Sequence, residues 1–182
     1  MPKCARERFE YETLSSMKDG TPVTVRPIVP EDEPLLAKFH QTLSDRSVYM
    51  RYFHILPLGN RVEHKRLANI CHADQDKEMV LVAENVGPNP GGRKIIGVGR
   101  WNKFPGTNHA EMAVLVSDGF QNRGVGTELF ARLIEFARAK KLQRLFAEIL
   151  PENVGMQHVA RKLGFQLSRK ISDPVITATL DL

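Results

Sequence analysis

Hydrophobic positions along the chain recur with two different spacings, which predict strands and helices in turn. β-prone residues on both sides of Asp19-Gly20 predict a hairpin, because Asp-Gly between such runs favours a tight turn. Further on, leucine and phenylalanine recur at helical spacing behind an acidic segment that contains Pro34. The predicted elements of this half are strands at 11–17 and 21–28, a helix opening at 31–34, a short helix capped by Ser44, and a helix at 62–71.

The second half alternates strands with two amphipathic helices. Its predicted strands are 78–86, 94–101, 111–116 and 145–150, with one or two more in 165–182, and the Gly- and Pro-rich segment 87–92 is a turn or short loop. One helix follows Gly126, with Leu129, Leu133, Phe136 and Ala137 as its buried stripe, and another spans 153–163 and ends at Gly164. This order predicts an α/β (α+β) fold, in which 1–20 form an N-terminal extension with a hairpin strand and 21–182 form one domain.

Composition adds the expected setting of the molecule. With 182 residues, 42% hydrophobic and 26% charged, the chain has the balance of a soluble globular domain. Its apolar runs are far shorter than the roughly 20 residues of a membrane span, and no apolar segment follows the first charges, so neither a membrane helix nor a secretory signal is expected. Cys4 and Cys71 alone suggest no disulfide framework or metal site. We therefore expect a cytoplasmic protein without a bound metal.

A net charge of +5 points to an anionic partner. Nucleic acid is one class to consider, but its usual footprint is a basic run with interleaved aromatic residues. The 26 lysines and arginines are mostly interspersed with acidic residues, so we expect no nucleic-acid partner. A small ligand that carries phosphate accounts for the excess charge equally well.

The most informative segment lies between the strand at 111–116 and the helix that follows it. Its loop reads Gln121-Asn122-Arg123-Gly124-Val125-Gly126. Two close glycines at such a junction let backbone N–H groups converge, and the helix N-terminus adds a partial positive charge. Arg123 supplies a full charge, so the segment predicts a diphosphate site. Taken alone, the two glycines are equally compatible with tight packing.

The loop matches the Gln/Arg-x-x-Gly-x-Gly/Ala signature of the GNAT family of N-acetyltransferases. Asn153, about thirty residues on, opens a helix that closes with Leu163-Gly164-Phe165, and this resembles the family's second motif. Upstream, Asp19-Gly20-Thr21 and Leu43-Ser44-x-x-Ser47-x-Tyr49-x-Arg51-Tyr52-Phe53 resemble the acetyltransferase domain of bacterial Pat-type protein lysine acetyltransferases. The resemblance covers about 21–182 and implies a mixed, mostly antiparallel sheet with splayed central strands between helices.

The resemblance also implies acetyl-CoA as the cofactor and a place for each part of it. Main-chain groups of Val114 and Val116 would pair with the pantetheine arm. Asn153 would hold the arm from the other side, although it is also a natural helix cap. The remaining implied cofactor residues are Gln121 and Arg123 at the rim of the diphosphate and the backbone amides of Asn122, Arg123, Gly124, Val125, Gly126 and Thr127.

Transfer to a lysine requires its neutral amine, although the pKa of a free lysine is near 10.4. Holding the amine neutral at pH 7 costs roughly 4–5 kcal/mol, so a nearby base is needed. Glu111, where Pat-like enzymes place their glutamate, is the candidate, and its neighbours Ala113 and Leu115 predict an apolar surround. An exposed strand-end glutamate is the alternative reading, and His109 is the reserve base.

The other chemical roles are less clearly supported. The N–H of Val116 is expected to stabilise the oxygen that becomes negative during transfer. Many relatives have a tyrosine as general acid seven residues after the asparagine, where this chain has Ala160. Cys71 as an acyl-carrying nucleophile is disfavoured, because it lies outside the matched motifs.

The acceptor is expected to be a lysine of a protein, with an acyl-CoA synthetase suggested by the Pat resemblance. Tyr49, Arg51, Tyr52 and Phe53 would line its groove. Core packing is the alternative for Tyr52 and the better interpretation for Phe53. A small amine or polyamine is the alternative, which acidic residues in the groove would favour. A non-catalytic acyl-CoA sensor is a further class. The sequence leaves monomer or dimer open.

Overall fold

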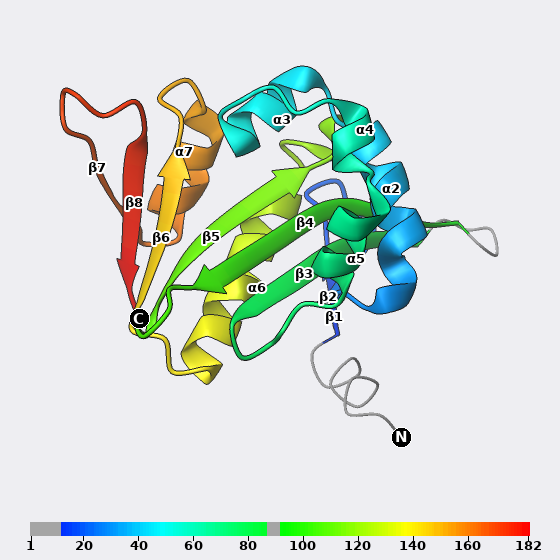
Figure 1. The fold of residues 1–182 in the computed structure, drawn as a ribbon, viewed down its shortest axis with the longest axis horizontal. Coiled ribbons are helices and arrows are strands. Elements are labelled where there is room, and N and C mark those ends of the chain that lie inside the picture. Colours follow the sequence, from blue (N-terminus) through cyan, green and yellow to red (C-terminus); the bar gives the residue numbers. More distant parts are fainter. Residues whose placement is uncertain (1–11, 87–91) are drawn as a thin grey trace.

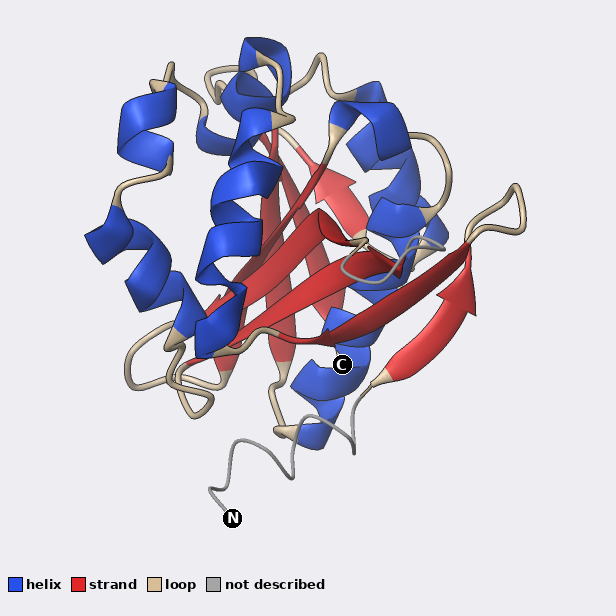
Figure 2. Cartoon of the chain, turned by 90° about the vertical axis from the view of Figure 1, so that its right-hand side faces the viewer, coloured by secondary structure: helices blue, strands red, loops and turns tan. Residues whose placement is uncertain are grey.

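The computed structural model describes residues 12–86 and 92–182, and there one mixed sheet lies between two layers of helices (Figures 1 and 2). The strands are β1 (Thr13–Ser16), β2 (Pro22–Pro27), β3 (Glu78–Val86), β4 (Arg93–Lys103), β5 (His109–Val116), β6 (Arg144–Ile149), β7 (Gln166–Ser168) and β8 (Ile176–Asp181). They form an eight-stranded sheet in the order β1-β2-β3-β4-β5-β6-β8-β7. Neighbours are antiparallel except β5 and β6. This confirms the predicted fold class.

Helices cover both faces of the sheet. They are α2 (Glu33–Gln41), α3 (Asp45–Tyr52), α4 (Leu58–Arg61), α5 (His64–Cys71), α6 (Val125–Ala139) and α7 (Val154–Lys162), with short 3-10 turns η1 (Pro30–Asp32) and η2 (Asp118–Phe120). Side chains of α2, α3 and α5, such as Leu36, Val48 and Leu67, pack with Val80 and Val82 in one cluster. The predicted stripe of α6 is buried in the other. The sheet thus has two separately packed faces.

Most predicted elements form where local signals are strong. β1 and β2 pair across the expected turn, and Ser44 caps α3 by accepting from the N–H of Ser47 at 3.2 Å. The predicted helix at 62–71 is wrong at its start, because Val62 ends the unpredicted helix α4 and α5 begins at His64. Leu58 is the only large apolar residue within α4, so periodicity gave no signal for it. The expected loop at 87–92 lies, except for Gly92, outside the described residues, as do residues 1–11.

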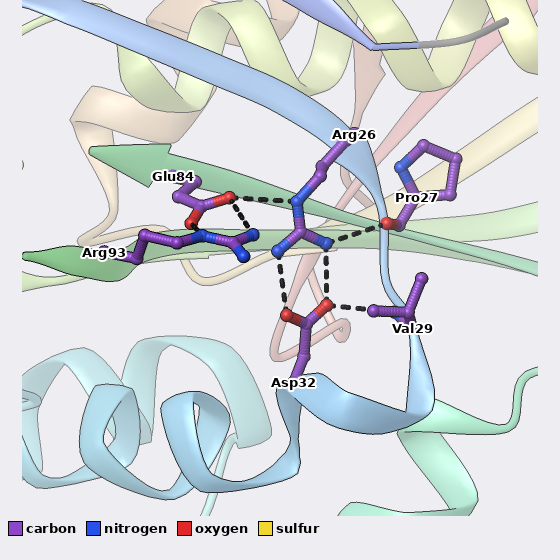
Figure 3. Close-up of polar contacts among 6 residues, drawn as sticks. All are labelled: Arg26, Pro27, Val29, Asp32, Glu84 and Arg93. Atoms are coloured by element: carbon purple, nitrogen blue, oxygen red, sulfur yellow. Dashed lines mark hydrogen bonds and ion pairs between the residues drawn. The ribbon is translucent and has the colours of Figure 1, made fainter. Parts of the chain in front are cut away.

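A buried ionic cluster fixes the start of the helical layer (Figure 3). Arg26 on β2 donates from its Nη1 and Nη2 to Asp32 at 2.7 and 2.8 Å and from its Nε to Glu84 at 2.9 Å. Asp32 also accepts the N–H of Val29, and Glu84, at a β-bulge, pairs with Arg93. Because Arg26, Asp32 and Glu84 are at most 3% exposed, their charges depend on one another. The cluster joins β2, β3 and β4 to the turn that opens α2.

Candidate active site

An opening forms in the sheet where β5 and β6 separate. The two strands pair over only three positions, and the last pair is Glu111 with Phe146. On its other side β5 stays paired with β4 as far as Val116. Figure 1 shows the two strands diverging beyond their start. The implied splayed strands are therefore present, and Glu111 is at the base of the opening.

The backbone of β5 presents hydrogen-bonding groups to this opening. The N–H of Ser117 donates to the carbonyl of Ile96, and the carbonyl of His109 accepts the N–H of Phe104, both at 2.9 Å. The main-chain N–H and C=O groups of the odd-numbered residues of β5 are therefore directed towards β4. Because main-chain groups alternate along a strand, those of Val114 and Val116 are directed to the side that β6 has left. An extended ligand can bind there as an added strand.

At the far end of β5 the chain forms a concave cradle of backbone amides. Asn122 and Gly124 have φ angles of 60° and 96°, separated by a residue with negative φ. Successive N–H groups then point to one side, which favours an anion. Among the described residues no side chain caps α6, and the N–H of Glu128 donates to the carbonyl of Gly124 at 3.0 Å. The amides of Val125, Gly126 and Thr127 thus lie at an open helix N-terminus.

Arg123 lies between this cradle and the β1–β2 turn. Its carbonyl accepts from the N–H of Lys18 at 3.0 Å, and its guanidinium lies 3.2 Å from Asp19 and above the ring of Phe120. The Arg123 side chain remains 45% exposed. A position at the rim of a bound diphosphate is compatible with this geometry and stays a prediction.

Gln121 joins the cradle to helix α3. Its Nε2 donates to Ser47 and Asp118 at 2.9 Å and to the carbonyl of Val116 at 3.1 Å. Asp118 also accepts the Ser47 hydroxyl and, at 2.5 Å, the N–H of Ser44. The amide nitrogen of Gln121 is therefore directed towards α3, with its position fixed by Asp118 and Ser47. Sequence reasoning gave neither residue a role here, although Ser47 belongs to the motif that resembles Pat-type domains and Ser44 was expected to cap this helix.

Helix α7 borders the opening beside β6 (Figure 1). Asn153 caps it by accepting the N–H of Met156 at 3.2 Å, so the structural reading of this asparagine applies and its pantetheine contact stays a prediction. Ala160 is fully buried in the core beneath the sheet. A general acid at that position is therefore absent from this chain.

Glu111 is exposed on the sheet face that α2, α3 and α5 cover. Cross-strand partners share a face, and Asn102 on β4 is opposite Glu111. Burial lowers the pKa of Arg51 on α3, while the nearby Tyr52 and Glu111 raise it. The expected apolar surround of Glu111 is therefore wrong, because helix packing brings polar side chains over its strand. His109, two residues earlier, lies edge-on to the ring of Phe146 at 5.9 Å.

Two further arginines converge on this face. Arg66 on α5 donates from its Nη2 to the hydroxyl of Tyr52 at 2.8 Å. Arg100 on β4 donates to Glu78 at 3.2 Å and to Asn102 at 2.7 Å. Arg66 and Arg100 also line an open groove of about 340 Å³. Nothing in the sequence marked either arginine, because only the strand register and helix packing bring them together.

The other residues expected at the acceptor groove divide into three environments. Tyr52 packs against the cluster of α2, α3 and α5, whereas Tyr49 is 40% exposed. Phe53 is half-buried, ends α3 with a φ of 63° and belongs to neither core cluster, so its prediction as core is wrong.

Burial raises the pKa of Cys71 to about 11, with Asp32 and Glu33 acting in the same direction. A thiol this hard to ionise is a poor nucleophile.

The described residues contain neither a membrane-spanning helix nor a metal-binding cluster. In 12–86 and 92–182 no helix has the length and apolarity needed to cross a membrane. The same residues contain no group of three or more His, Cys, Asp or Glu side chains placed to hold a metal ion.

Comparisons with known proteins agree with this geometry. The family profile described as an acetyltransferase (GNAT) domain matches residues 23–166. The GNAT domain of Streptomyces lividans Pat superposes with a TM-score of 0.82 at 30% identity, covering 95% of this chain and 98% of that one. An acetyltransferase of Pseudomonas aeruginosa is 25% identical over 160 residues, which are 88% of this chain and 83% of that protein. The acetyltransferase Pat of Mycolicibacterium smegmatis is 26% identical over 140 residues, 77% of this chain but only 40% of its own length.

Proposed function

The chain belongs to the GNAT acetyltransferase family, whose members use acetyl-CoA, and from this premise we propose that it acetylates the side-chain amine of a lysine in a protein substrate. The observation that carries the proposal is the arrangement along β5. Glu111 is at the base of the sheet opening, and the amide cradle follows the strand's other end. At about 3.3 Å per residue, Glu111 and Val116 are about 17 Å apart along one strand. Because the strand holds this spacing, a diphosphate bound in the cradle would place the pantetheine arm of acetyl-CoA along the opening that leads towards Glu111.

Residues of this chain have distinct tasks in the proposed reaction. The cradle amides bind the diphosphate, and the main chain of Val114 and Val116 orients the arm and the thioester carbonyl. Glu111 takes a proton from the lysine ammonium, directly or through a water. The amine nitrogen then bonds to the carbonyl carbon as the C–S bond breaks, and the thiolate leaves without a protein acid at Ala160. The amine's second proton passes to solvent.

Protein lysine is favoured as the acceptor by the likeness to Pat domains. We call the sheet face around Glu111, with Arg51, Arg66, Arg100 and Glu78, the acceptor face. A polyamine is disfavoured, because the three arginines of this face repel a polycation. The expected cytoplasmic location and an acyl-CoA synthetase as substrate remain part of the proposal. Since the chain spans only 40% of the Mycolicibacterium Pat, any regulation of that protein by its remaining part is outside the proposal.

Replacement of Glu111 by Gln tests the proposed base. The variant should bind acetyl-CoA like the parent in calorimetry, while turnover of a lysine substrate falls about 10²- to 10⁴-fold. Glu135→Gln on the exposed side of α6 is the matched control and should change neither quantity. Unchanged turnover of Glu111→Gln would exclude this glutamate as the base.

A labelling experiment tests the acceptor class. Incubation with labelled acetyl-CoA and a cell lysate, followed by mass spectrometry, should locate the label on lysine Nζ atoms of one or a few proteins. If small amines carry all of the label, the protein-lysine proposal is wrong. If acetyl-CoA binds and no acceptor is labelled, the chain is a sensor.

A further inference from the structure

The acceptor face contains guanidinium groups with few carboxylates to balance them. Arg66 interacts with three neutral partners: the hydroxyl of Tyr52 at 2.8 Å, the carbonyl of Arg61 at 3.0 Å and Nε2 of His40 at 3.4 Å. Burial lowers the pKa of His40 to about 4, with Arg66 and Arg61 adding to the effect, so the ring is neutral at pH 7. None of these partners compensates the charge of Arg66.

Arg51 is in a similar position, because it also contacts the ring of Tyr52. Its guanidinium carbon lies 5.0 Å from the Tyr52 ring centre, and that of Arg66 lies 5.5 Å away. Throughout 12–86 and 92–182, neither arginine has a carboxylate oxygen within 4.0 Å. Tyr52 therefore holds two cations close together without an ion pair to either.

Arg100 completes the set from the sheet side. Its Nη2 contacts Glu78, but its Nε is buried and has no hydrogen-bond partner among the described residues. The charged side chains near Glu111 and along the adjoining groove are four cations, Arg51, Lys65, Arg66 and Arg100, and three carboxylates, Glu63, Glu78 and Glu111. This face therefore carries one positive charge in excess. Partly desolvated cations without a carboxylate partner, such as Arg51 and Arg66, are costly, so this excess of positive charge beside Glu111 points to an anion brought by a ligand.

We propose that the acceptor lysine arrives with a carboxylate, an acidic side chain next to it in the substrate, which binds to the guanidiniums of Arg51, Arg66 and Arg100 while the lysine amine reaches Glu111. This inference rests on the proposed function and specifies its substrate class. A guanidinium binds a carboxylate through two parallel hydrogen bonds, so one acidic residue can both neutralise the surplus and orient the lysine. The arginines would then select the lysine that is modified.

Paired peptides test the inference. Both peptides of a pair contain one lysine and differ at one neighbouring position, which is Glu in one peptide and Gln in the other. Different pairs place this position one or two residues before or after the lysine. At the best position, kcat/KM with Glu should exceed that with Gln about ten- to hundred-fold, the range of one charge-assisted contact. The difference should shrink in high salt, because screening weakens charge interactions at a partly exposed site.

Neutral variants identify the residues that make the selection. Arg66→Met and, separately, Arg100→Met should reduce the Glu-to-Gln ratio towards one, whereas Arg138→Met on the far side of the sheet should leave it unchanged. The ratio is insensitive to a general loss of activity, and having two variants covers the case in which one fails to fold. A retained ratio in both folded variants would overturn the assignment.

The outcomes separate this inference from the proposed function. If the parent enzyme acetylates the Glu and Gln peptides equally at every position, the carboxylate is not recognised, although lysine acetylation stands. If the enzyme acetylates free amino acids and no peptide, the anion is the acceptor's own carboxylate and the peptide-borne source is wrong. If no lysine substrate from peptides or lysate is acetylated, the proposed function fails and this inference fails with it.

Discussion

Replacing Gly124 by Ala tests the amide cradle, because this residue has a φ of 96°. An L-residue with a Cβ pays roughly 1–2 kcal/mol in the left-handed region. Space is not the difficulty, since a Cβ at this position would meet only Lys18 Cγ, at 3.7 Å. The free energy of unfolding should therefore fall by about 1–2 kcal/mol, which for a chain of this size lowers Tm by roughly 2–8 °C.

The same substitution should weaken cofactor binding by more than its strain alone suggests. Relief of the strain requires rotation of the peptide units next to Gly124, and the amides of Val125 and Gly126 then turn away from the diphosphate. Each lost hydrogen bond to a charged group is worth about 1.5–3 kcal/mol, so Kd for coenzyme A should rise at least about tenfold. Binding of S-acetylpantetheine, which has no diphosphate, should be nearly unaffected.

Gly126→Ala is the matched control in the same segment. Gly126 has an ordinary helical φ, and an added Cβ would lie 3.6 Å from Val116 Cγ2, a normal packing distance. Stability should stay the same or rise by up to about 1 kcal/mol, because alanine favours a helix over glycine. Calorimetry with coenzyme A and with S-acetylpantetheine, beside urea unfolding, gives all the required numbers. If Gly124→Ala loses stability as expected yet binds coenzyme A like the parent, the cradle does not hold the diphosphate.

Three further substitutions test the packing and the buried charges. Arg26→Met should lower the free energy of unfolding by about 3–5 kcal/mol, because it removes the cation bound to the buried Asp32; a change below 1 kcal/mol in urea unfolding would contradict this. Burial lowers the pKa of His40 to about 4 in the folded protein, against about 6.5 in the unfolded chain, so the free energy of unfolding should fall by roughly 3 kcal/mol as pH falls from 6.5 to 4. The free energy of unfolding of His40→Gln should therefore depend less on pH in that window. Gly99→Ala forces a Cβ to 2.9 Å from Leu133 Cδ1 and should lower the free energy of unfolding by about 1–3 kcal/mol. An unchanged Tm would mean that α6 can move away from the sheet without cost.

The parts of the molecule that the sequence predicted are those made by neighbouring residues. The hairpin at Asp19-Gly20, the cap at Ser44 and the turn from β5 into α6 each depend on residues within a few positions. Local chemistry decides their conformation, so pattern reasoning is sufficient. The cradle could be predicted for the same reason, since a single stretch from Gln121 to Thr127 builds all of it.

The acceptor face shows what such reasoning cannot reach. The apolar surround expected for Glu111 follows from Ala113 and Leu115 on its own strand, but what covers that strand comes from α3 and α5. Those helices bring Arg51 and Arg66, which are separated from Glu111 by 60 and 45 positions. Register and helix packing decide this meeting, and neither is readable from spacing along the chain.

Period-two geometry along β5 explains how one strand can serve both substrates. Odd residues such as Glu111 direct their side chains to the layer of α2, α3 and α5, while Val114 and Val116 direct main-chain groups into the opening beside β6. In the proposed reaction the donor and the acceptor would therefore approach β5 from different directions and need not compete for space. In the proposed reaction the cation of the acceptor would approach Glu111 close to the guanidiniums of Arg51, Arg66 and Arg100. A bare ammonium would be repelled there, whereas an ammonium accompanied by a carboxylate would be attracted as a pair. The charge that disfavours a polyamine in the proposed function is thus the same charge that would favour a lysine beside an acidic residue.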